Sequence, residues 1–105
     1  MLRIYDTAIE LVVEMRAVEA VLKRCDLHLA DQLHRAMDSL TLNIAEGSHA
    51  QGKKRNAMYF TAKGSAQEAL ACIDTARAWG YQIGVSNETI ERFRKVIGTL
   101  CRCVR

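Results

Sequence analysis

The sequence contains no proline, and its 6 glycines are scattered along the chain. Proline and glycine mark the turns of β-rich folds and the flexible linkers between domains, so their scarcity argues against both kinds of structure. A chain of 105 residues has enough material for one modest hydrophobic core and too little for a second. We therefore expect a single domain over residues 1–105, and we expect it to be all-α.

Long apolar runs are absent as well, although 50% of the residues are hydrophobic. A helix needs roughly 20 consecutive apolar residues to cross a bilayer, and the runs in this chain are only a few residues long. Asp6, Glu10 and Glu14 also break the pattern that a secretory signal peptide would need near the N-terminus. The sequence thus predicts a cytoplasmic protein with no membrane partner.

The chain lacks a recognisable disulfide or metal pattern. Its 4 cysteines should remain thiols in a reducing compartment, and Cys101 and Cys103 lack the two-residue spacer of a zinc or redox pair. Glu46-x-x-His49 matches half of the di-iron site of helical bundles, but that site needs a second such pair and further carboxylates. We expect no metal and no cofactor.

Two other features come close to a catalytic motif without completing it. Residues 47–53 fit the start of a P-loop, but Lys54 stands where the magnesium-binding Ser or Thr belongs, and the preceding segment has a helical pattern where a P-loop needs a strand. His28 and His34 have no evident cysteine or aspartate partner for nucleophilic catalysis. No catalytic residue is nominated, and we expect no enzymatic activity.

What the chain does contain is a repeated three-and-four spacing of apolar residues, which is typical of amphipathic helices. The pattern predicts four helices. The first covers about residues 3–24, and after a connection at residues 25–28 the apolar stripe of the second resumes at Leu29 and ends at Gly47. The third and fourth cover about residues 53–79 and 87–105. Asp26 and Ser86 are the expected N-caps of the second and fourth helices, while Gly47 and Gly80 are expected to end the second and third. Four helices joined by short loops pack most simply as an up-down-up-down antiparallel four-helix bundle, although other all-α arrangements fit the same pattern.

Some small and apolar residues are not needed to form the core of one small bundle. Gly64, Ser65 and Ala66 are small enough to let a neighbouring helix approach closely, or they reflect helix propensity with one tolerated glycine. Several apolar residues lie off the main stripes and suggest a subunit interface, although scattered exposed apolar residues are common. These residues are Leu11, Val13, Val21, Leu42 and Met58.

Several motifs carry a resemblance to a known family. They are Gln32 and Arg35, the Asn-Ile-Ala-Glu-Gly block at 43–47, Tyr59-Phe60, and Gly64-Ser65-x-x-Glu68. In order and spacing they resemble the four helix bundle protein family, also called 23S rRNA intervening-sequence proteins, and more distantly the accessory proteins of diversity-generating retroelements. The chain departs from the family pattern at Thr41, where a proline is usual, and it lacks a Trp-Gln pair near the start.

The resemblance implies a fold and an assembly. It implies an antiparallel four-helix bundle, commonly a homopentamer, with no established catalytic activity. In the retroelement relatives it also implies a basic surface that works with a reverse transcriptase and nucleic acid.

Part of the same segment forms a polar stripe on the second predicted helix. Arg35, Ser39, Asn43 and Glu46 are spaced by four, four and three, which places them along one side of the helix. Such a stripe either forms a hydrogen-bonded structural network or lines a functional groove, and we favour the structural network.

Charge is distributed unevenly between the two halves of the chain. Residues 1–50 carry 5 Lys/Arg and 8 Asp/Glu, whereas residues 51–105 carry 10 and 4. In an up-down-up-down bundle the starts of the first and third helices share an end with the finishes of the second and fourth. That end would gather Arg3, Lys53, Lys54, Arg55, Arg102 and Arg105.

The gathered charges lead to a functional hypothesis. Repeated around an oligomer, this end would form a basic rim able to attract phosphates. The alternative is that Arg102 and Arg105 only complement a helix C-terminus and that residues 53–55 are a solvated loop. We expect a homo-oligomeric, non-enzymatic scaffold that engages RNA, DNA or a reverse transcriptase-like protein through Lys53, Lys54, Arg55, Arg102 and Arg105. A protein–protein interaction module without nucleic-acid binding is the second hypothesis.

Overall fold

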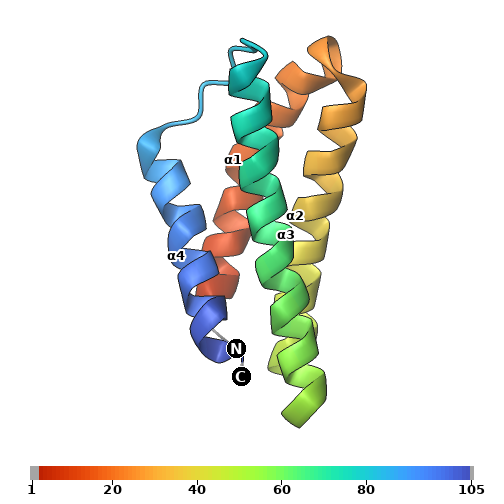
Figure 1. The fold of residues 1–105 in the computed structure, drawn as a ribbon, viewed down its shortest axis with the longest axis vertical. Helices are drawn as coiled ribbons and strands as arrows, with labels where there is room; N and C mark the ends of the chain where they lie inside the picture. The colour runs from red at the N-terminus through yellow and green to blue at the C-terminus, as the bar shows by residue number, and fades with distance from the viewer. Residues whose placement is uncertain (1–2, 105) are drawn as a thin grey trace.

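The computed structural model describes residues 3–104, which form four α-helices and no strand (Figure 1). The helices are α1 (Ile4–Cys25), α2 (Leu27–Ser48), α3 (Gly52–Ala78) and α4 (Asn87–Cys103). They run alternately up and down, and α1 and α3 each pack against both α2 and α4. The predicted up-down-up-down antiparallel four-helix bundle is therefore confirmed.

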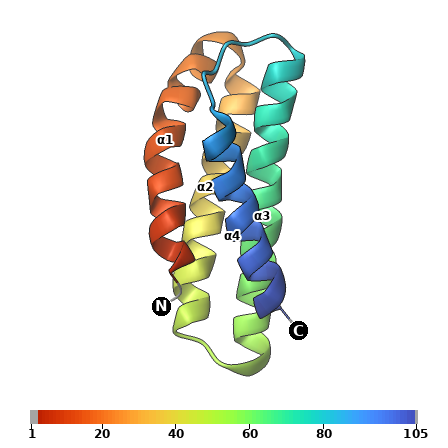
Figure 2. The ribbon, with the colours of Figure 1, turned by 90° about the vertical axis from the view of Figure 1, so that its left-hand side faces the viewer.

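The bundle is elongated, with extents of 42 × 24 × 20 Å. The most extensive helix pair is α2 with α3, and their hairpin extends past the start of α1 and the finish of α4 (Figure 2). This offset leaves the first turns of α3 partly uncovered at that end of the bundle. Among residues 3–104, no helix combines the length and the apolar character needed to cross a membrane.

The turn between α1 and α2 consists of Asp26 alone. Its Oδ1 accepts a hydrogen bond of 3.0 Å from the backbone N–H of Leu29, which is the N-cap bond that the sequence predicts. Its Oδ2 accepts a hydrogen bond of 3.2 Å from the hydroxyl of Tyr81 in the α3–α4 connection. Burial, together with the charge of Asp26, raises the pKa of Tyr81. One aspartate thus caps α2 and connects two loops.

The other predicted caps of α3 and α4 are confirmed. Gly80 has a φ of 84° and follows α3 as its C′ residue, with Tyr81 N donating to Ala76 O at 3.0 Å and Gly80 N donating to Arg77 O at 2.9 Å. These two bonds form a Schellman motif, which glycine favours because it adopts positive φ without strain. The hydroxyl of Ser86 accepts from the N–H of Thr89 at the start of α4.

Gly47 does not end α2, contrary to the prediction. The helix continues to Ser48, and Gly47 is a buried helical residue that faces the ring of Tyr59 on α3. Gly47 therefore allows α2 and α3 to approach closely. The sequence alone cannot distinguish a glycine with this role from a glycine that ends a helix.

All four helices contribute to one core. Its largest fully buried side chains are Leu11, Leu22, Leu33, Leu40, Ile44, Ile73, Phe93, Val96 and Leu100. Burying one such side chain contributes roughly 1.5–3 kcal/mol before entropy is counted. Leu11 belongs to this core, so its assignment to a surplus apolar surface was wrong. The buried stripe of α1 passes through Leu11 and leaves Ile9 39% exposed.

A partly buried charged network holds α4 against α1. Glu14 forms an ion pair with Arg92 and accepts a hydrogen bond of 3.0 Å from the hydroxyl of Thr89. Arg92 also approaches Glu10 at 3.4 Å. The network fixes the position of α4 along α1, and with it the position of the last turn of α4.

Candidate nucleic-acid interface

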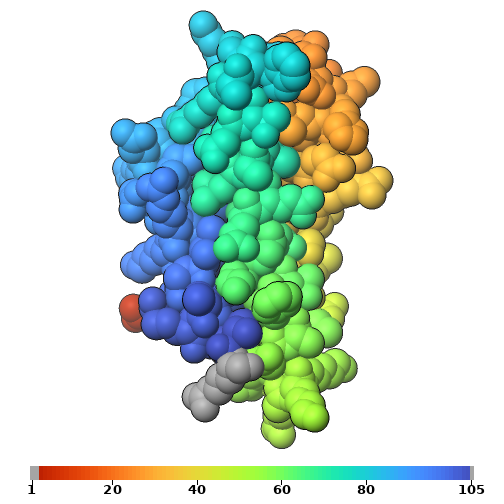
Figure 3. Space-filling view, in the orientation of Figure 1, coloured from red at the N-terminus to blue at the C-terminus, as the bar shows by residue number. Residues whose placement is uncertain are grey.

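Five basic residues gather at the end of the bundle where α1 and α3 begin and α2 and α4 finish. We call this group the basic end, and it comprises Arg3, Lys53, Lys54, Arg55 and Arg102. The space-filling view shows the last turns of α4 next to the first turns of α3 at this end (Figure 3). Arg105, which the sequence also nominates, lies outside the described residues.

The basic end concentrates cations that have no carboxylate partner within the described residues. Four cations elsewhere on the described surface form ion pairs with carboxylates, in the pairs Lys23–Glu19, Arg35–Asp31, Arg92–Glu14 and Arg94–Glu91, whereas others, such as Arg24 and Lys95, do not. Within residues 3–104, no residue of the basic end takes part in an ion pair. The neighbouring carboxylates are Asp6 in the first turn of α1 and Glu46 in the last turn of α2. The cations at this end outnumber the carboxylates, so the local charge is positive.

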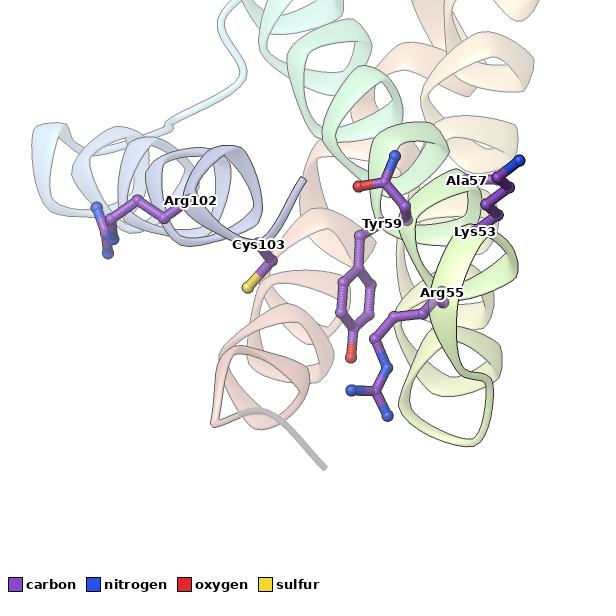
Figure 4. Close-up of a pocket in the computed structure, with 8 residues that line it drawn as sticks. Lys53, Arg55, Ala57, Tyr59, Arg102 and Cys103 are labelled. Atoms are coloured by element: carbon purple, nitrogen blue, oxygen red, sulfur yellow. The ribbon is translucent and has the colours of Figure 1, made fainter. Parts of the chain in front are cut away.

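A pocket of about 660 Å³ opens at this end between the start of α3 and the last turn of α4 (Figure 4). It is lined by Gly52, Lys53, Arg55, Asn56, Ala57, Tyr59, Arg102 and Cys103. The volume lies within the usual range for small-molecule sites. Three of the five basic-end residues thus line one concave surface.

Tyr59 forms the inner wall of this pocket. Its ring packs directly on Gly47, and the residue is only 4% exposed. Among residues 3–104, no group forms a hydrogen bond with its hydroxyl. The hydroxyl oxygen itself is accessible to solvent, on the side of the residue that lines the pocket. The pocket therefore contains an unused hydrogen-bonding group beside its cations.

Arg55 has a structural role that the sequence did not reveal. Its Nε donates to the backbone oxygens of Gly47 at 3.2 Å and Ala50 at 2.9 Å, which satisfies carbonyls at the finish of α2. This anchoring leaves the terminal Nη atoms without a partner among residues 3–104. Figure 4 shows the guanidinium of Arg55 next to the hydroxyl end of Tyr59, while the side chains of Lys53 and Arg102 extend away from them. Arg55 and Tyr59 therefore form the centre of the pocket, and Lys53 and Arg102 lie at its rim.

The predicted polar stripe on α2 is divided by the fold. Ser39 and Asn43 are half-buried: Asn43 Nδ2 donates to Ser39 O at 2.7 Å, and the hydroxyl of Ser65 on α3 donates to Ser39 Oγ at 2.6 Å. Arg35 is exposed and forms an ion pair of 2.9 Å with Asp31. Glu46 is exposed, and no ion pair involves it within residues 3–104. Ser39 therefore joins α2 to α3, Asn43 bonds to Ser39 within α2, and Arg35 and Glu46 lie on the surface.

Sequence reasoning missed the partner of His34. Its Nδ1 lies 3.0 Å from the carboxylate of Glu19 on α1, and its Nε2 lies 3.4 Å from Asp38. The hydrogen bond and charge of Glu19 raise the pKa of His34; burial acts to raise the pKa of Glu19, but His34 and Lys23 lower it overall. Within the described part of the chain, no cluster of His, Cys, Asp or Glu has the composition of a metal site.

The fold and this end of the molecule define an antiparallel four-helix bundle with a basic, recessed pocket. The chain belongs to the family described as 23S rRNA-intervening sequence protein, which it matches over residues 1–104. The family resemblance inferred from the sequence motifs is thus confirmed. No curated protein and no solved structure shows a significant match to the chain.

Proposed function

We propose that this protein is a non-enzymatic, self-associating scaffold that binds nucleic acid through the basic end. The observation that carries the proposal is the clustering of Arg3, Lys53, Lys54, Arg55 and Arg102 at one end of the bundle, where none of them forms an ion pair within residues 3–104. Uncompensated Lys and Arg side chains attract phosphates and gain affinity when counterions are released from the nucleic acid. The family description refers to 23S rRNA intervening sequences, so an RNA is the first nucleic acid to test.

Self-association is supported by exposed apolar side chains on three helices. Val13 on α1 is 57% exposed, Leu42 on α2 is 61% exposed, and Phe60 on α3 is 58% exposed. Ile9 lies four residues before Val13, on the same face of α1. Exposed apolar side chains that share one helix face, as Ile9 and Val13 do, are typical of a surface covered in an assembly. Association of several copies would place several basic ends side by side and strengthen their combined field.

The binding experiment needs a variant that removes charge without disturbing the fold. Arg55 is unsuitable because its Nε caps α2. The variant of choice is Lys53→Glu/Lys54→Glu, because both side chains are exposed and make no ion pair within residues 3–104. The matched control is Arg24→Glu/Lys95→Glu, which changes the net charge equally at exposed positions away from the basic end.

Binding of a labelled oligoribonucleotide is measured by fluorescence anisotropy from about 50 to 200 mM salt. The wild type and the control variant should bind with a steep dependence on salt, and Lys53→Glu/Lys54→Glu should bind far more weakly. Circular dichroism and light scattering check that helicity and mass are unchanged. Equal binding by both variants would contradict a specific role for the basic end.

The second candidate function is a protein-interaction module without nucleic-acid binding. The exposed apolar residues support it independently of charge. If the wild type binds neither RNA nor DNA at low salt, the scaffold would act on proteins alone. Contacts of that kind weaken little as salt is raised, so the salt series separates the two functions.

A further inference from the structure

The pocket at the basic end brings together two donor groups that the fold itself leaves unused. Arg55 is held by its Nε, so its terminal Nη atoms are presented in a fixed orientation. Tyr59 is held by its ring, which lies between α3 and Gly47, so its hydroxyl is also fixed. Both groups line the same pocket, and Figure 4 shows their polar ends turned toward the same part of it. Fixed donors bind a ligand with little loss of side-chain entropy.

The chemistry of these groups indicates an anionic ligand. A guanidinium has only donors, and its planar fork fits two oxygens of one phosphate or carboxylate. A tyrosine hydroxyl supplies one further donor to a third oxygen. A phosphate monoester presents three equivalent terminal oxygens and carries close to two negative charges at neutral pH, which a carboxylate does not. The uncompensated positive charge around the pocket favours the more highly charged group.

Further features agree with a terminal phosphate. Gly52 and Lys53 of the first turn of α3 line the pocket, and the N-cap residue Gln51 makes no side-chain cap hydrogen bond. The N-terminus of this 27-residue helix thus adds its positive dipole end to the site. A recessed pocket admits the end of a chain more readily than an internal phosphodiester, which continues on both sides. The volume of about 660 Å³ leaves space for the nucleoside that bears the phosphate.

We propose that the pocket formed by Arg55 and Tyr59 binds a phosphate monoester, either at the end of a nucleic-acid strand or on a free nucleotide. Arg55 binds two phosphate oxygens and Tyr59 donates to the third. Lys53 and Arg102 at the rim interact with the adjoining sugar–phosphate segment. The strand-end form of this proposal rests on the proposed function, because it requires that the basic end bind nucleic acid.

The test compares oligoribonucleotides of one sequence that carry a 5′-phosphate, a 3′-phosphate or hydroxyls at both ends. Uridine 5′-monophosphate serves as the free-nucleotide probe, with binding followed by NMR chemical shifts. The variant Tyr59→Phe removes a single hydroxyl and keeps the ring on Gly47, so the fold should be unchanged. The control is Tyr81→Phe, which removes a hydroxyl at the opposite end of the bundle.

The wild type and Tyr81→Phe should bind one phosphorylated end about tenfold more tightly than the hydroxyl end, because the phosphate adds charge-assisted hydrogen bonds. Tyr59→Phe should lose most of this preference while retaining the salt-dependent binding common to all three oligonucleotides. A preference that survives Tyr59→Phe unchanged would overturn the assignment of the pocket.

The remaining outcomes separate this inference from the proposed function. Binding of uridine monophosphate without binding of any oligonucleotide would support the phosphate site and contradict the nucleic-acid function. Equal binding of all three oligonucleotides without binding of the nucleotide would overturn the phosphate site and leave the nucleic-acid function standing. Binding of neither probe would overturn both.

Discussion

The ring of Tyr59 on α3 lies against the backbone of α2 at Gly47, where no side chain separates them. A Cβ atom added to Gly47 would lie 2.6 Å from Cδ1 of Tyr59 and nearer still to Cε1, both well inside van der Waals contact. This approach lets α2 and α3 pack closely at the end of the hairpin, and it fixes the direction in which Tyr59 enters the pocket.

The substitution Gly47→Ala should therefore destabilise the protein. Alanine is favoured over glycine in a helix by about 0.5–1 kcal/mol. Overpacking against Tyr59 costs about 1–3 kcal/mol, so the steric effect outweighs the gain in helix propensity. Gly64 provides a matched control, because it is an exposed helical glycine with no atom within 4 Å of an added Cβ.

Chemical denaturation of the two variants gives the measurement. The free energy of unfolding should fall for Gly47→Ala and rise by about 0.5–1 kcal/mol for Gly64→Ala. Stabilisation by both substitutions would show that Tyr59 moves aside at no cost, and the close approach would then have no energetic significance.

How well each feature of the fold can be predicted depends on the distance along the chain between the residue and the partner that determines its role. Asp26, Ser86 and Gly80 act within a few residues of their own position, and all three caps were predicted correctly from local patterns. Gly47 depends on Tyr59, which is distant in sequence and belongs to another helix. A local signal could suggest only that Gly47 ends a helix, and that prediction was wrong.

Removing Arg92 should destabilise the bundle more than removing a surface arginine. Glu14 pairs with Arg92 in a half-buried position between α1 and α4. In Arg92→Met the carboxylate of Glu14 loses its charged partner, and we expect a loss of about 1–3 kcal/mol in the free energy of unfolding. Arg94→Met breaks the exposed pair with Glu91 and should change the free energy of unfolding by less than about 0.5 kcal/mol. Urea denaturation measures both, and equal effects would contradict a special role for the Glu14–Arg92 pair.

The hydrogen bond between Ser39 and Ser65 should contribute measurably to the α2–α3 contact. Ser65 is buried, and Ser65→Ala removes its bonds to Ser39 Oγ and to the carbonyl of Thr61. We expect a loss of about 1 kcal/mol in the free energy of unfolding. Because the two serines share one bond, the effect of Ser39→Ala/Ser65→Ala should be smaller than the sum of the single effects. Arg35→Ala serves as the control and should change the free energy of unfolding very little. If the losses of the two single serine variants add up to the loss of the double variant, the bond between the serines contributes nothing.

The candidate site was predictable in position and unpredictable in detail. Antiparallel topology alone brings Lys53 and Arg102 to one end, so charge counting located the basic end. The roles of Arg55 and Tyr59 depend on tertiary contacts with Gly47 and Ala50, which no spacing along the chain encodes. The pocket centre therefore emerged only from the three-dimensional structure.

The pair His34–Glu19 should make stability depend on pH. The pKa of His34 is raised above its ordinary value of 6.5, chiefly by the hydrogen bond to Glu19, so the stabilisation is complete below that value and is lost as pH rises through the folded-state pKa. The pKa of Glu19 is lowered from 4.5. Burial acts to raise this pKa, but the hydrogen bonds and charges of His34 and Lys23 outweigh burial. The stabilisation by the Glu19 carboxylate is therefore lost as pH falls below 4.5. The pair is therefore most stabilising between pH 4.5 and 6.5. The side chain of His34 is 56% exposed, which limits the effect to less than about 1 kcal/mol.

The comparison uses His34→Gln, with His28→Gln as a control that removes another exposed histidine. The difference in unfolding free energy between wild type and His34→Gln should be largest near pH 5.5 and should shrink as the pH rises through the raised pKa of His34, because the loss of its charge removes the attraction to Glu19. The difference between wild type and His28→Gln should not follow this trend. A pH-independent difference for His34→Gln would mean that the histidine contributes by packing and not through its charge.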